Sequence, residues 1–143
     1  MSIRESTKYA FANALKQLLT TKDLQKIRVT ELCELCGAER PTFYYHFRDK
    51  YDLIAWIYMK DFEQSVKDNG GIYNQRQATL QMYRMLEQKA FYRKVLAEQT
   101  QNALSNYIIQ YNQQSIEYLM KKQLQEDALS REQLFSIRFF VRA

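Results

Sequence analysis

Residues 40–47 hold a dense group of side chains that donate or accept hydrogen bonds. The sequence there reads Arg-Pro-Thr-Phe-Tyr-Tyr-His-Phe and includes the single histidine of the chain. Guanidinium, hydroxyl, phenol and imidazole groups are the ones that bind phosphates and the edges of nucleic-acid bases. Phe43 and Phe47 are four residues apart, so both fall on one face of a helix and are expected to point inward. The polar side chains are left to face a nucleic-acid groove.

Other kinds of chemistry find little support in the sequence. His46 has no accompanying nucleophile motif, so a role as catalytic base is not expected. Cys33 and Cys36 form a CxxC pair, which could indicate metal or redox chemistry. The second cysteine pair and the further histidines of a zinc site are absent, and small buried residues are the alternative reading. We therefore expect packing cysteines, no metal, no cofactor and no enzymatic activity.

The elements that position residues 40–47 are predicted to be helices. Glycine (3) and proline (1) are scarce among the 143 residues, and 46% of the residues are hydrophobic, enough for a real core. Apolar residues recur at three- and four-residue steps along most of the chain. The pattern predicts an all-α fold with helices over about 4–20, 29–36, 40–46, 50–68, 75–89, 90–98, 101–125 and 131 onward.

Local signals place the ends of several of these helices. Gly37 suits the left-handed position that ends a helix. Asp49 and Asp52 have the spacing of a helix cap and the third helical residue, a carboxylate form of the capping box. Ser130 and Gln133 form the usual capping box at the last helix. Leu24 and Ile27, in the connection before residue 29, are expected to anchor it to the core.

The chain is divided here into a head, residues 1–50, and a body, residues 51–143, connected by the helix that starts near residue 50. The head carries nine basic and six acidic residues, a net charge of +3, and the body carries +2. A basic head suits a polyanionic partner. No apolar run approaches 18 residues and no secretory h-region is present, so we expect a cytoplasmic protein without a membrane partner.

Residues 8–58 resemble the DNA-binding domain of the TetR family of transcriptional regulators. The likeness includes Cys33 at a small-residue position, Gly37, the run from Thr42 to Phe47, and Lys50. The run together with Asp49 to Leu53 and Trp56 is similar to the subgroup that contains dihydroxyacetone-kinase-operon regulators. The resemblance implies a three-helix helix-turn-helix head and binding of double-stranded DNA. It also implies that Arg40, Pro41, Thr42 and Tyr44 face bases and groove, and that Thr30, Tyr45, His46 and Lys50 face phosphates.

Lys50 has an unusual position, because a cation in the first turn of a helix opposes the helix macrodipole. The position becomes favourable if the lysine and the helix N-terminus bind the same phosphate. Three residues depart from the family pattern: Arg28 replaces Ser or Thr, and Ala38 and Glu39 replace Val-Ser. Glu39 is expected to be a weaker cap, and its carboxylate either weakens binding of the polyanion or accepts from a cytosine amino group.

The body is expected to form a homodimer that places two heads on a near-palindromic site. The candidate packing surfaces are two apolar stripes, Leu104/Ile108/Tyr111 and Leu134/Ile137/Val141, of which the first also suits internal core. Gln99–Tyr118 suits either a pocket for a small polar effector or a helix with a solvated face. The apolar pattern continues to the last residue, so further terminal helices are expected. The alternative function is a protein-interaction module that binds a partner regulator and keeps an auxiliary or degenerate head.

Overall fold

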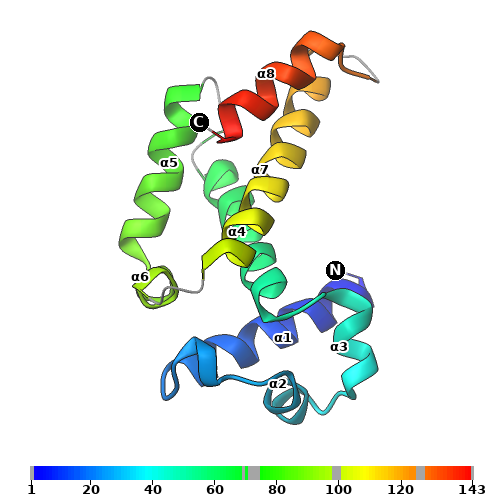
Figure 1. The fold of residues 1–143 in the computed structure, drawn as a ribbon, viewed down its shortest axis with the longest axis vertical. Helices are drawn as coiled ribbons and strands as arrows, with labels where there is room; N and C mark the ends of the chain where they lie inside the picture. The colour runs from blue at the N-terminus through cyan, green and yellow to red at the C-terminus, as the bar shows by residue number, and fades with distance from the viewer. Residues whose placement is uncertain (1, 69, 71–74, 98–100, 125–127, 143) are drawn as a thin grey trace.

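The computed structural model describes residues 2–68, 70, 75–97, 101–124 and 128–142, and within these ranges every regular element is a helix. The predicted all-α fold is therefore confirmed. Figure 1 shows the head and the body stacked along the long axis of the molecule. The elements are α1 (Ile3–Leu19), η1 (Leu24–Lys26), α2 (Val29–Cys36), α3 (Arg40–His46), α4 (Lys50–Asp68), α5 (Gln75–Gln88), α6 (Ala90–Ala97), α7 (Gln101–Leu124) and α8 (Arg131–Arg142).

Helix α4 leads from the head into the body. Helices α1, α2 and α3 pack together at one end of the molecule, and the start of α4 joins them there (Figure 1). Helix α7 packs along α4, α5 packs on α4 as well, and α8 packs on α7 at the end farthest from the head. Among the described residues, no helix combines the length and the apolar character needed to cross a membrane.

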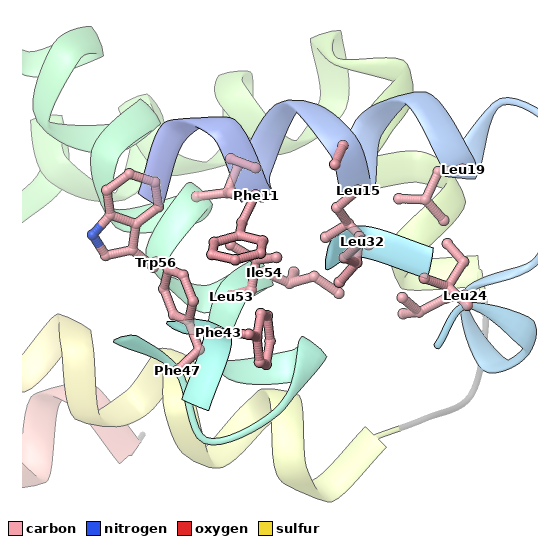
Figure 2. Close-up of a cluster of buried hydrophobic side chains, with 14 of the residues drawn as sticks. Phe11, Leu15, Leu19, Leu24, Leu32, Phe43, Phe47, Leu53, Ile54 and Trp56 are labelled. Atoms are coloured by element: carbon pink, nitrogen blue, oxygen red, sulfur yellow. The ribbon is translucent and has the colours of Figure 1, made fainter. Parts of the chain in front are cut away.

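The head is built around one apolar core, shown in Figure 2. The ring of Phe43 meets the ring of Phe11 edge-on at 5.2 Å between centroids, and Phe47 lies 5.9 Å from Trp56. Phe43 of α3 and Phe47, which follows the helix, are both buried, as their spacing predicts. Leu24 and Ile27 are also fully buried, so the connection before α2 is anchored as expected. The other large members of this core include Leu15, Leu19, Leu32, Leu53 and Ile54.

The predicted helix ends are found with small differences. Gly37 ends α2 with φ 63° and ψ 30°, in the left-handed region. At the start of α4, Asp49 Oδ1 accepts from the N–H of Asp52 at 2.9 Å, as the capping pattern predicts. Asp52 Oδ2 accepts from the N–H of Arg48 at 2.9 Å, one residue before the position that a standard capping box would use. The reciprocal bonds between Ser130 and Gln133 confirm the capping box at α8.

Helix α4 contributes to two cores. Its residues 53–57 belong to the head core, whereas Tyr58 and Phe62 form a second cluster with Met85 of α5 and Tyr92 of α6. Tyr107, Ile108 and Tyr111 of α7 pack against the head core from the body side, so this stripe faces the interior. The side chains of Leu104 and Val141, which belong to the two stripes considered above, lie outside the described residues.

Candidate nucleic-acid interface

Helix α3 is attached to the head by one face and exposed on the rest of its surface. Phe43 is fully buried and Phe47, which follows the helix, is 2% exposed. Arg40, Pro41 and Thr42 are exposed at the N-terminal end, and Tyr44 and Tyr45 are 47% and 66% exposed. Two neighbouring exposed aromatic side chains form a patch of the kind that can mark an interaction site. Sequence reasoning therefore placed five of the candidate residues on one accessible helix.

The local sequence explains why so short a helix forms here. Pro41 stands in the first turn, where its missing N–H leaves no hydrogen bond unmade. Glu39 occupies the N-cap position without a side-chain capping bond, as expected for a weaker cap. The helix is instead fixed by the two buried phenylalanines, since a seven-residue helix has little stability of its own. The carboxylate of Glu39 remains exposed at the end of α3 where the base-facing residues lie.

The start of α2 brings Thr30 to the same head. Thr30 is exposed in the first turn of α2, a position from which a hydroxyl and nearby N–H groups can bind a phosphate. Arg28, the N-cap residue, has no acceptor atom, and the Glu31 carboxylate accepts from its N–H at 3.2 Å. Glu31 also pairs with Lys22, which lowers the pKa of the carboxyl group. Although Arg28 replaces the Ser or Thr of the family pattern, the N-terminus of α2 is still capped, by the side chain of Glu31, its third residue.

Lys50 binds the protein itself. Its ammonium group donates to the carbonyls of Leu24 (2.7 Å), Gln25 (3.2 Å) and Ile27 (3.1 Å), in and just after η1. These bonds explain how a lysine is accommodated in the first turn of α4, because three carbonyl dipoles surround its charge. An ammonium group has three N–H donors, and all three find acceptors here. Phosphate binding by Lys50 remains a prediction, and the structure adds an anchoring role.

A second basic group lies beside the C-terminal end of α3. A pocket between α1 and α3 is lined by Ser2, Arg4, Glu5, Lys8, Tyr45 and His46. The Arg4 guanidinium lies 5.7 Å from the ring centroid of Tyr45, and the Arg40 guanidinium lies 5.9 Å from that of Tyr44. The two phenols of α3 thus each have an arginine over the ring. Arg4 and Lys8 were not among the residues predicted from sequence. The signal for them is a basic pair four residues apart on the polar side of the first helix.

The charged groups that line this pocket are two cations, Arg4 and Lys8, and one carboxylate, Glu5, so the balance of charge favours an anion. Partial burial lowers the pKa of His46, and the nearby charges of Lys8 and Arg4 lower it further. His46 is therefore neutral near pH 7 and able to take up a proton when a negative group approaches. The two cysteines, by contrast, show no sign of a role in binding an anion. Burial raises the pKa of both the Cys33 and the Cys36 thiol, and Cys33 lies in the head core, as expected for packing.

An exposed short helix behind a tight turn, carried on a basic three-helix head, defines a helix-turn-helix DNA-binding domain. Residues 13–57 match the family of bacterial regulatory proteins described as the tetR family. Through this head the chain is similar to the TetR family, which confirms the resemblance seen in the sequence. Both matches are to transcriptional regulators, which agrees with the expectation that the chain has no enzymatic activity.

A curated relative extends the likeness beyond the head. The chain is 30% identical over 90 residues to the "HTH-type dhaKLM operon transcriptional activator DhaS" of Lactococcus lactis subsp. lactis (strain IL1403). The match covers 62% of this chain and 48% of the relative, so it spans about half of the relative's length. The name of this relative agrees with the subgroup resemblance noted above.

Proposed function

We propose that this chain is a transcriptional regulator that binds a near-palindromic DNA operator as a homodimer, in the cytoplasm, under the control of a small effector or a partner regulator. The observation that carries the proposal is α3, whose polar and aromatic side chains are exposed while Phe43 holds it to the core. In this proposal α3 enters the major groove, with Arg40, Pro41, Thr42 and Tyr44 toward the bases. Thr30, Tyr45, His46 and Lys50 lie toward the backbone phosphates, and Arg4 and Lys8 join this second group.

We place the boundary between the DNA-binding domain and the dimerisation domain after residue 50. The head reads DNA, and the body, residues 51–143, supplies the dimer contacts and receives the effector or partner. Large apolar side chains that are exposed on the body support a contact of this kind. Tyr83 on α5, Tyr118 on α7 and Phe135 on α8 are 62%, 65% and 70% exposed. A second copy of the chain would cover part of this surface in a homodimer.

The same exposed side chains favour one alternative function. A body that binds another regulator would use Tyr83, Tyr118 and Phe135 for that partner, and the head would then be auxiliary or degenerate. Glu39 gives this alternative some weight, because its exposed carboxylate lies where DNA phosphates would approach. The two functions differ in what the purified chain does alone: only the first requires it to bind a specific duplex without help.

Gel-shift assays with the purified full chain and DNA fragments from the region around its own gene test the proposal. We expect one fragment to be retained above random duplex, with an affinity that falls steeply as salt rises. Light scattering over a concentration series, in parallel, should show a dimer. Retention of no fragment above random DNA at low salt, or a clean monomer at micromolar concentrations, would favour the interaction module.

A matched pair of variants separates base reading from simple charge. Arg40→Ala should weaken operator binding by about 1–3 kcal/mol and relax the preference at particular base pairs. Arg138→Ala removes the same charge from an exposed position on α8, at the opposite end of the molecule, and should leave both properties nearly unchanged. Equal losses from the two variants would remove Arg40 from the base-facing group.

A further inference from the structure

Two tyrosines of the body form hydrogen bonds with the segment where α3 leads into α4. The hydroxyl of Tyr107 donates to Asp49 Oδ2 at 3.2 Å, and the hydroxyl of Tyr111 donates to Asp52 Oδ1 at 3.0 Å. The tyrosines are four residues apart and lie on one face of α7. Asp49 directly precedes α4 and Asp52 lies in its first turn, so the two aspartates are three residues apart, a spacing close to that of the tyrosines.

The carboxylates that receive these hydroxyls are already part of the head. Asp49 uses its other oxygen for the N–H of Asp52, and Asp52 uses its other oxygen for the N–H of Arg48. Each aspartate therefore links the backbone of the turn to a side chain of α7. Asp52 is buried, so its bond to Tyr111 is shielded from water. Burial and the neighbouring carboxylates raise the pKa of both phenols, which stay protonated and able to donate at neutral pH.

The turn held in this way lies directly behind the reading helix. Helix α3 ends at His46, and Phe47 and Arg48 are the only residues between it and Asp49. A second connection holds the other side of the head: the Lys94 ammonium of α6 donates to the Leu19 carbonyl at the end of α1. Because that connection remains when the tyrosine bonds are lost, loss of the hydroxyls should change the orientation of the head rather than detach it.

We propose that Tyr107 and Tyr111 are positioning residues that set the angle between the body and α3 through the capping carboxylates Asp49 and Asp52. The proposal rests on the proposed function, in which two heads joined through their bodies must fit two half-sites at once. A fixed angle raises the effective concentration of the second head at its half-site, and a loose angle lowers it. The tyrosine pair thereby makes the chain selective for the spacing of half-sites, without touching DNA.

The test uses the full chain with both residues changed to phenylalanine, Tyr107→Phe and Tyr111→Phe, which keeps the rings and removes only the hydroxyls. The DNA probes are the operator fragment retained by the unchanged chain, the same fragment with its spacer lengthened or shortened by one base pair, and a single half-site. The double variant should bind the natural spacing about tenfold more weakly, discriminate less among spacers, and bind the single half-site as well as the unchanged chain does.

A matched control and a readout without DNA complete the design. Ser136→Ala removes a hydroxyl from an exposed side chain of α8, where that hydroxyl donates to the Glu132 carbonyl of the same helix, and should change none of these affinities. Hydrogen exchange, followed by mass spectrometry on peptides that cover residues 47–53, should be several-fold faster in the double variant, because the amides of Arg48 and Asp52 lose support.

Each outcome decides a distinct question. Equal loss at the half-site and at the full operator would show general damage to the head and overturn the proposal. Unchanged spacing preference would overturn it as well, and so would unchanged hydrogen exchange. If the unchanged chain binds two half-sites no better than one, the proposed dimeric function fails. The exchange experiment then still decides whether the tyrosines hold the turn.

Discussion

The contacts that stabilise the head differ in kind from those that stabilise the body. The head has a continuous core in which the rings of Phe11, Phe43 and Phe47 meet edge-on or tilted and exclude water (Figure 2). In the described part of the body the corresponding cluster is small, and polar bonds extend it, such as that from the Tyr92 hydroxyl to Asp61 at 2.6 Å. Head and body meet through apolar side chains such as Val95 and Ile108, which pack on the head core, and through the polar groups of Lys94, Tyr107 and Tyr111.

This difference assigns different tasks to the two regions. A closely packed apolar core has few alternative arrangements, so the head can present α3 in one conformation. The contact between the two regions combines apolar packing with hydrogen bonds, and the hydrogen bonds can exchange with water at modest cost, so the orientation of the head relative to the body is easier to change than the head itself. A regulator needs both properties: a rigid surface for DNA and an adjustable connection for control.

The largest effect should come from the head core. Phe43→Ala should lower the free energy of unfolding by about 3–5 kcal/mol, because it removes a fully buried ring that contacts both Phe11 and Phe47. Urea unfolding followed by the fluorescence of Trp56, the single tryptophan and a member of this core, measures the loss directly. Tyr45→Ala, on the exposed side of the same helix, should change the stability by less than about 0.5 kcal/mol. Similar losses from both would contradict a one-sided α3.

Lys50 should have the next largest effect. Lys50→Ala should cost about 1–2 kcal/mol of stability, since three carbonyls near η1 lose a charged donor. Lys26→Ala removes the same charge from an exposed side chain of η1 and should cost much less. The slope of operator affinity against salt separates anchoring from phosphate binding. A reduction of the slope by about one unit in Lys50→Ala is expected from the proposed phosphate contact, and a smaller reduction would leave anchoring as the role of this lysine.

The contrast between Lys50 and Phe43 shows which features the sequence predicts. Phe43, Phe47, Gly37 and the Asp49 cap follow from spacing and from the conformations that each residue type adopts. These rules act within a few residues, so one sequence suffices to apply them. The carbonyl partners of Lys50 lie more than twenty positions away, and the tyrosines that hold Asp49 and Asp52 lie nearly sixty positions away.

Partners at such distances depend on how the helices pack, which periodicity does not specify. For the same reason Arg4 and Lys8 were missed: their place beside His46 follows from the way α1 crosses α3 rather than from the motif itself. The exposed residues of α3 could therefore be predicted from local spacing, whereas the contacts that orient this helix could not.

In the body, the buried hydroxyl of Tyr58 should contribute little to the stability of the fold. The Tyr58 hydroxyl is buried and has no well-formed hydrogen bond within the described part of the chain. Burial raises its pKa to about 12, with a smaller opposing effect of the nearby Asn112 side chain. Tyr58→Phe should therefore leave the chain as stable as before or stabilise it by up to about 1 kcal/mol, measured as a urea midpoint. Phe62→Ala in the same cluster provides the destabilising control, and a clear loss from Tyr58→Phe would reveal a bond at this hydroxyl.

The smallest expected effect concerns pH, and it separates the stability of the head from its affinity for DNA. The pKa of His46 is lower in the folded chain than in the unfolded one. As the pH falls below about 6.5, the unfolded state takes up the proton first, so the free energy of unfolding should decrease there and stay constant at higher pH. A phosphate beside Arg4, Lys8 and His46 favours the imidazolium form and raises the pKa in the complex, so DNA affinity should increase over the same range.

Operator affinity measured by fluorescence anisotropy at constant ionic strength, between about pH 8 and about pH 5.5, should therefore rise a few-fold while the urea midpoint falls. His46→Gln keeps a hydrogen-bonding side chain that does not titrate, and it should remove both trends. If affinity and stability fell together in the unchanged chain, the loss of affinity would reflect unfolding of the head. His46 would then be a packing residue at the edge of α3 instead of a phosphate contact.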